Sequence, residues 1–201
     1  MLFRSYQYLA NCHSRLGNKY YQYVSLVKSL GQAKSCKDST ILSSCYNNFG
    51  VYYGSEGTKN LRRSLFYFRK ALDYTSDSDI SNKSRFLTNL GAIYEDLNAR
   101  QKAQTIYLEV WNKYSDQLNA EKNFNLTSNL GSLYLVNGDL KRATFFYQKA
   151  YEKFNELPEK SSADFSIYYN LSELESMKGN MGKSREYLKT YIDLQEKDRK
   201  S

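Results

Sequence analysis

Four asparagines recur through the chain at nearly equal intervals of 41, 40 and 41 residues. They are Asn48, Asn89, Asn129 and Asn170. An asparagine amide carries both a hydrogen-bond donor and an acceptor. It can therefore pair with both backbone groups of an extended peptide without reading that peptide's side chains. A row of such amides predicts a peptide-binding surface. The alternative is that each amide hydrogen-bonds a neighbouring repeat of the chain itself.

Catalytic chemistry is poorly supported by the sequence. It has no phosphate-binding glycine loop, no GxSxG, no HExxH and no cysteine–histidine motif. His13 is the only histidine, and the three cysteines form no CxxC pair, which argues against a metal site. We expect no enzyme, no metal and no cofactor, and we expect Cys12 and Cys45 to be buried structural residues. An enzyme ranks last among the functions considered.

The asparagines belong to a pattern that occurs five times. Its most regular mark is a small residue after a large apolar one, at intervals of 40, 41, 40 and 41 residues. The five pairs are Leu9-Ala10, Phe49-Gly50, Leu90-Gly91, Leu130-Gly131 and Leu171-Ser172. Seven residues after each small residue comes a glycine or asparagine that tolerates left-handed backbone: Gly17, Gly57, Asn98, Gly138 and Gly179. Such residues end helices, so each unit should turn there.

Each unit then continues with a second helical face. In the fourth unit Ala143, Tyr147 and Ala150 are spaced 4 and 3 residues apart, which places them on one side of a helix. In the first helix, positions five before, one before and two after the small residue form an apolar core stripe. For units two to five these are Cys45/Phe49/Tyr52, Phe86/Leu90/Ile93, Leu126/Leu130/Leu133 and Ile167/Leu171/Leu174. Each unit is therefore predicted to be a helical hairpin whose small residues let its two helices approach closely.

This order of residues resembles the tetratricopeptide repeat, with Leu-Gly-x-x-Tyr on the first helix and Ala-x-x-x-aromatic-x-x-Ala on the second. The period is near 40 residues, as in the long repeats of bacterial sensor and regulator proteins. The resemblance implies an all-α, right-handed superhelix of five hairpins in a single solenoid domain over residues 1–201. The expected repeats are approximately 3–37, 39–77, 80–118, 120–158 and 161–198.

The resemblance also implies where a partner would bind. In a tetratricopeptide superhelix the concave groove is lined mainly by the first helices, and the position two before the small residue points into it. That position holds Asn48, Asn89, Asn129 and Asn170 in units two to five. Neighbouring groove positions include Asn11 and, six before the small residue, the basic side chains Arg4 and Arg85. We expect the two arginines to favour an acidic group on the partner. The alternative is that they extend into solvent.

Some members of this family hold chaperone tails with a set of Lys, Asn and Arg residues called a carboxylate clamp. The corresponding positions here are Gln7, Asn11, Asn48, Arg85 and Asn89. Two of the cationic positions are lost, which argues against binding of such a tail. The predicted function is therefore a non-catalytic scaffold that binds a protein or an extended peptide in its groove.

Composition is consistent with a globular scaffold and leaves other functions open. The chain has 201 residues, one proline and a formal net charge of +8. Residues 1–40 carry six basic residues against one acid, so the surplus gathers at the N-terminal end. Such a surplus can attract an acidic partner or nucleic acid, so a basic nucleic-acid-binding module stays an alternative. No Arg-rich run accompanies it, which favours an ordinary solvated surface. The other alternative is a ligand-sensing region of a signalling or transcription regulator.

Location and assembly are expectations from weaker signals. No stretch has the ~18 apolar residues needed to span a bilayer, and the first residues do not form a signal peptide. We expect a cytoplasmic protein, or a periplasmic one if the chain is a fragment of a membrane sensor. Association of copies through the end repeats is also open.

Overall fold

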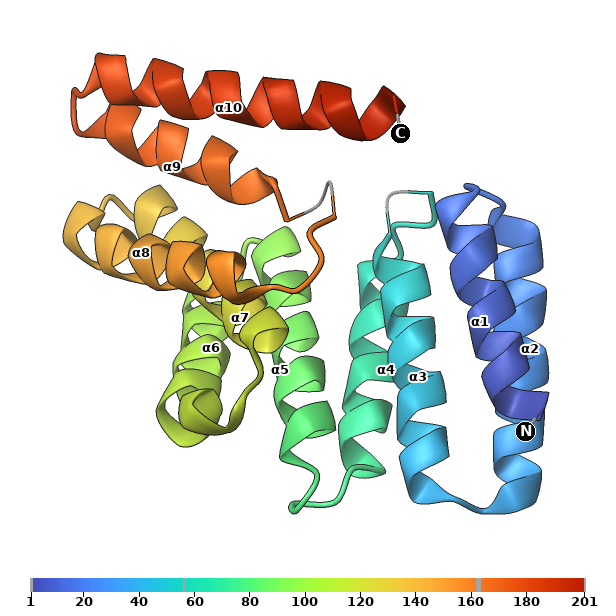
Figure 1. Cartoon of the computed structure of the whole chain (residues 1–201). Helices are drawn as coiled ribbons and strands as arrows, with labels where there is room; N and C mark the ends of the chain where they lie inside the picture. The colour runs from blue at the N-terminus through green and yellow to red at the C-terminus, as the bar shows by residue number, and fades with distance from the viewer. Residues whose placement is uncertain (1, 56, 162–163, 201) are drawn as a thin grey trace. The chain divides into compact units, whose positions relative to one another are not determined.

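All regular secondary structure is helical over the residues that the computed structural model describes, which are 2–55, 57–161 and 164–200 (Figure 1). The α-helices are α1 (Leu2–Arg15), α2 (Lys19–Cys36), α3 (Ser39–Gly54), α4 (Leu61–Asp73), α5 (Ile80–Asp96), α6 (Arg100–Tyr114), α7 (Ala120–Val136), α8 (Leu140–Glu156), α9 (Ser166–Met177) and α10 (Met181–Lys200). A 3₁₀ turn covers Ser115–Gln117. The predicted all-α class is confirmed. None of the helices in the described ranges is long and apolar enough to cross a membrane.

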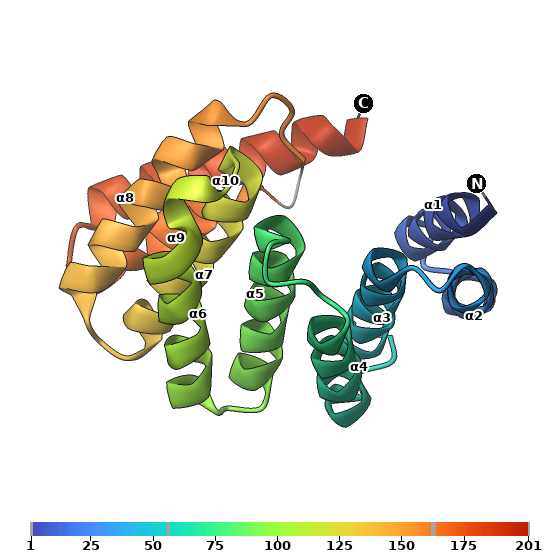
Figure 2. The ribbon, with the colours of Figure 1, turned by 90° about the horizontal axis from the view of Figure 1, so that it is seen from below.

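Two compact units make up the chain, the first up to Ile106 and the second from Tyr107, and they are described separately. In the first unit the α3/α4 hairpin lies between the α1/α2 hairpin and α5 (Figure 2). In the second unit α7 pairs with α8, α9 pairs with α10, and α8 packs against α9. The hairpins fall at the positions expected from the repeat. Their arrangement into one continuous solenoid domain stays a prediction.

The core is the predicted stripe. All twelve stripe residues of units two to five are buried. In the first unit, Phe49 and Tyr52 on α3 share an apolar cluster with Leu26 of the preceding hairpin. Leu90 and Ile93 on α5 cluster in the same way with Phe68 on α4. The second and third hairpins therefore bury their stripes against the hairpin before them, as stacking of repeats requires.

The first hairpin departs from this rule. Its stripe positions include Leu9 and Cys12, and both side chains are exposed. The prediction that Cys12 is buried is therefore wrong, because the described structure has no preceding hairpin to cover it. Cys45 is buried as expected.

Small residues bring the helices of a hairpin together. A Cβ atom on Gly50 would lie 2.6 Å from the ring of Phe68, and one on Gly131 would lie 2.4 Å from the ring of Tyr147. Ser64 on α4 donates a hydrogen bond to the carbonyl oxygen of Gly50 at 2.8 Å, which fixes the same close approach. The predicted role of the small residues holds at these positions.

Helix ends follow the predicted turn residues with one exception. Gly17, Asn98, Gly138 and Gly179 all have positive φ. In the second unit of the repeat, α3 has already ended at Gly54, before the predicted turn residue Gly57, and Lys59 takes the left-handed conformation in this longer loop.

The side chains of Asp38 and Asp79 cap α3 and α5 by accepting hydrogen bonds from the backbone N–H groups of Ile41 and Asn82. The start of α9 differs from these two helices. Asp164 instead accepts hydrogen bonds from Ser161, and α9 begins at Ser166 without a side-chain cap. Residues 162–163 of that stretch lie outside the described residues.

Candidate peptide-binding groove

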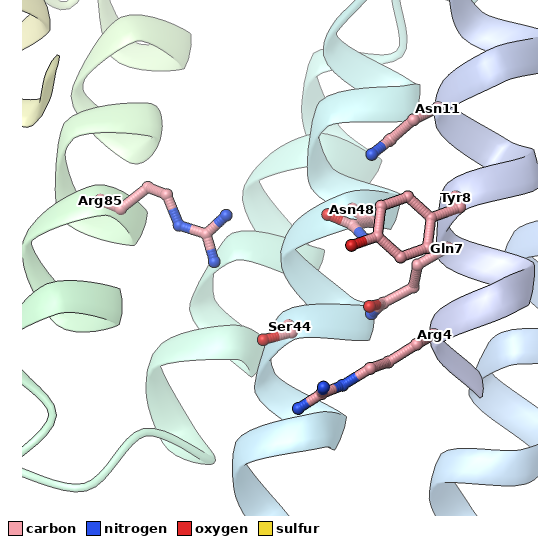
Figure 3. Close-up of a pocket in the computed structure, with 7 residues that line it drawn as sticks. All are labelled: Arg4, Gln7, Tyr8, Asn11, Ser44, Asn48 and Arg85. Carbon is pink, nitrogen blue, oxygen red and sulfur yellow. The ribbon is translucent and has the colours of Figure 1, made fainter. Parts of the chain in front are cut away.

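Side chains from three first helices surround a cavity of about 330 Å³ in the first unit (Figure 3). Its lining residues are Arg4, Gln7, Tyr8 and Asn11 on α1, Ser44 and Asn48 on α3, and Arg85 on α5. Four of these seven residues, Arg4, Asn11, Asn48 and Arg85, are candidate site residues from the sequence. The other three occupy groove positions of the same register. Equivalent positions of successive hairpins thus meet at one place.

Helix geometry explains why these residues converge. Residues three or four apart lie on one side of a helix, so Arg4, Gln7 or Tyr8, and Asn11 form a single row on α1. Ser44 and Asn48 form the matching row on α3. The two rows face the same space, and the Arg85 side chain extends toward it from α5 (Figure 3).

The cavity is basic. Two arginines line it, and no carboxylate is among its lining residues. Arg85 is held in place, because its Nη2 atom donates to Oδ1 of Asn82 at 2.7 Å and its guanidinium lies 4.9 Å from the ring centre of Phe86. Arg4 is exposed and lies beside the ring of Phe3. An anionic group entering the cavity would meet two cations and several amide and hydroxyl groups.

The surplus positive charge of the chain lies in the unit that holds this cavity. The first unit, residues 1–106, carries 15 basic residues against seven acids, and the second carries 14 against 14. The net charge of +8 therefore belongs to the first unit. Such a field raises the local concentration of acidic partners and speeds their association.

Asn89 does not line the cavity. Its Nδ2 atom donates to Oδ1 of Asn47 at 2.9 Å, and Nδ2 of Asn47 donates to Oδ1 of Asn48 at 3.4 Å. Asn47, which the register places in the groove, is only 2% exposed. Asn89 thus makes the contact between neighbouring repeats that the sequence leaves as an alternative to ligand contact. This chain of amides fixes Asn48 from the side of α5.

Asn129 and Asn170 lie in the second unit, on α7 and α9. Both side chains are half-buried. The four asparagines are therefore divided between the two units, with Asn48 and Asn89 in the first. Their part in binding stays a prediction.

The buried thiol of Cys45 lies just behind the cavity. Burial raises its pKa, although hydrogen bonds with Ser29 and Gln7 act in the opposite direction. The Sγ atom is 3.3 Å from Oγ of Ser29 and 3.7 Å from Nε2 of Gln7. A thiol in this setting stays protonated and serves as a packing residue, as predicted. Within the described ranges, no group of three or more His, Cys, Asp or Glu residues could hold a metal ion.

Sequence reasoning missed a second cavity, of about 390 Å³, in the second unit. Its lining residues are Trp111, Ser115, Asp116, Leu118, Asn123, Thr127, Lys149 and Lys153. The amide of Asn123 is fixed by donating to the carbonyl oxygens of Ser115 and Leu118. The cavity forms where α6 passes through a 3₁₀ turn into α7, and the repeat pattern carries no signal for such an irregular connection.

Comparison with known proteins agrees with the fold. Residues 165–198 match the tetratricopeptide repeat family model, which covers α9 and most of α10. A kinesin light chain of Podospora anserina with nearly identical tetratricopeptide-like repeats shares 14% identity at a TM-score of 0.69, over 98% of this chain and 96% of that one. The chain therefore has the fold of tetratricopeptide-repeat proteins.

Two further solved structures are similar in fold. BtubC from P. vanneervenii shares 19% identity at a TM-score of 0.71, covering 98% of this chain and 79% of that one. PilF from Pseudomonas aeruginosa shares 18% identity at a TM-score of 0.69, covering 96% and 76%. At these identities the likeness concerns the fold alone. No curated protein matches the sequence.

Proposed function

We propose that this tetratricopeptide-repeat chain is a non-catalytic protein-binding scaffold whose first unit binds an extended peptide segment with an acidic group. The observation that carries the proposal is the cavity between α1, α3 and α5, where Arg4, Asn48 and Arg85 meet with no lining carboxylate. The fold of the neighbours supports a repeat scaffold for protein interaction in general. The preference for an acidic peptide rests on the two arginines of this cavity.

In this proposal two kinds of side chain have different tasks. Asn48, Asn11 and Gln7 pair with backbone N–H and C=O groups, so they bind any extended segment. Arg4 and Arg85 select for a carboxylate on that segment, because a charge-assisted hydrogen bond is about twice as strong as a neutral one. The inter-repeat bond of Asn89 keeps the Asn48 amide oriented, so Asn89 acts as a positioning residue.

The test is a peptide array in which every Asp- or Glu-containing peptide has an Asn or Gln counterpart. We expect the wild-type chain to prefer the acidic members. The double variant Arg4→Ala/Arg85→Ala should weaken acidic binding by about tenfold or more, since a hydrogen bond to a charged group contributes about 1.5–3 kcal/mol. It should leave the neutral peptides nearly unaffected. Asn48→Ala should weaken both classes alike, because it acts on the peptide backbone.

A matched control separates local recognition from overall charge. Arg15→Ala/Arg62→Ala removes two exposed basic residues that do not line the cavity, so the net charge falls equally. Equal loss of binding in the two double variants would contradict a specific site. A chain that bound no peptide, but bound duplex or single-stranded nucleic acid with steep salt dependence, would favour the nucleic-acid module instead.

A further inference from the structure

The first hairpin exposes residues that every other hairpin buries. Leu9 is 46% exposed and Cys12 is also exposed. In the next two hairpins of the register the same positions hold Phe49 and Tyr52, and Leu90 and Ile93, all of which are buried. Those residues pack against the second helix of the hairpin before them. We call Leu9 and Cys12 the leading face.

The last hairpin exposes the opposite half of the same interface. Leu188 and Ile192 on α10 are 38% and 47% exposed. The equivalent residues in the first unit are Leu26 and Leu30 on α2, and Phe68 and Leu72 on α4. Each pair lies in an apolar cluster with residues of the helix that begins the following hairpin, α3 or α5. Helix α10 is the outermost helix of the second unit (Figure 1). We call Leu188 and Ile192 the trailing face.

The leading and trailing faces hold the two sets of repeat positions that pack against each other between successive hairpins. We propose that copies of this chain associate head to tail, with the leading face of one copy seated on the trailing face of another. The contact would repeat the one that α5 makes with α4, in which Leu90 and Ile93 of the first helix lie against Phe68 and Leu72 of the helix before it. This proposal is independent of the peptide-binding groove.

Charge favours this pairing over a symmetric pairing of two leading faces. Residues 1–40 carry a formal charge of +5, whereas residues 161–201 carry seven basic and seven acidic residues. Two leading faces brought together would repel each other, and a leading face on a trailing face would not. A head-to-tail contact uses two different patches, so each copy can bind one neighbour at each end, and the copies join into an open chain or a closed ring.

The experiment is sedimentation velocity across a concentration series, with two single variants that each block one face. Leu9→Glu places a charge in the leading face, and Ile192→Glu places one in the trailing face. Both positions are already exposed, so the variants should stay folded, which circular dichroism checks. Wild type is expected to form species larger than a dimer as concentration rises. Each variant alone should be a monomer, with association weakened by more than about tenfold.

Mixing the variants gives the decisive result. Leu9→Glu keeps an intact trailing face and Ile192→Glu an intact leading face, so the mixture should form a one-to-one heterodimer and nothing larger. Val136→Glu is the control, because it makes the same kind of change at an exposed valine on α7 outside both faces, and it should associate like wild type. A wild type that stays monomeric throughout overturns the proposal. So does an Ile192→Glu variant that still dimerises, because only a symmetric leading-face contact explains it.

Discussion

At the scale of single residues, Gly131 shows how the repeat depends on missing side chains. A Cβ atom there would lie 2.4–2.9 Å from three ring carbons of Tyr147, which is itself 1% exposed. The ring has no room to move, so any added atom must displace a helix. The same contact between Gly50 and Phe68 makes this a property of the repeat and not of one hairpin.

We therefore expect Gly131→Ala to lower the free energy of unfolding by about 1–3 kcal/mol, the usual cost of overpacking a core. Urea denaturation measures it. Gly182→Ala is the control, because Gly182 lies in α10 with nothing within 4 Å of an added Cβ. Alanine there should stabilise the chain by up to about 1 kcal/mol through helix propensity. Equal effects of the two substitutions would mean that the Gly131 contact is not tight in solution.

At the scale of elements, the turn between α9 and α10 is closed by Glu175. This carboxylate, which occupies a position that tyrosine fills in units two to four, accepts hydrogen bonds from Nδ2 of Asn180 at 2.8 Å and Nζ of Lys178 at 3.0 Å. Burial tends to raise the pKa of Glu175, but these hydrogen bonds and the nearby lysines outweigh it and lower the pKa. The ionised form therefore holds the turn.

A lowered folded-state pKa gives stability that is complete above the pKa of the unfolded chain and is lost as pH falls through the folded value. We expect Glu175→Gln to lower the free energy of unfolding at neutral pH by about 1 kcal/mol, since it weakens a charge-assisted hydrogen bond. The difference in free energy of unfolding between this variant and wild type should shrink as the solution is acidified below about pH 4, near the ordinary pKa of glutamate. Thermal melts over a pH series test this, with Glu186→Gln, an exposed glutamate on α10, as the control. A gap that does not change with pH would show that the charge of Glu175 contributes nothing.

The sequence predicted these elements well wherever one hairpin has a neighbour on each side. The stripe Phe86/Leu90/Ile93 could be found because every unit faces the same packing problem. The position of a residue in the repeat does not predict its burial where the neighbouring hairpin is missing, as at Cys12. It also does not predict the helix end where the loop is longer, as after α3, where Lys59 takes the left-handed conformation. The repeat pattern predicted four of the residues that line the cavity of the first unit. It did not predict the hydrogen bond from Asn89 to Asn47, because a position in the repeat does not determine which way a side chain turns.

At the scale of the molecule, stability should vary along each unit because a repeat gains from its neighbours. In the first unit α3/α4 packs against α2 on one side and α5 on the other, whereas α1/α2 packs against the rest of the unit mainly through α3. In the second unit α9 packs against both α8 and α10, whereas α10 leaves Leu188 and Ile192 exposed. Local opening costs less free energy where fewer apolar contacts must be broken.

We expect amide hydrogens of α1 and α10 to exchange faster than those of α3 and α8. The difference should be about tenfold for each ~1.4 kcal/mol by which the free energy of local opening is lower in the end helices. Hydrogen–deuterium exchange with mass spectrometry measures this for each helix. The comparison should be made on dilute chain and on concentrated chain. Head-to-tail association would slow exchange in α1 and α10 together at high concentration and leave α3 unchanged. Uniform protection in the dilute sample would contradict the nearest-neighbour account of the fold, because the end helices would then be as stable as the helices that are covered on both sides.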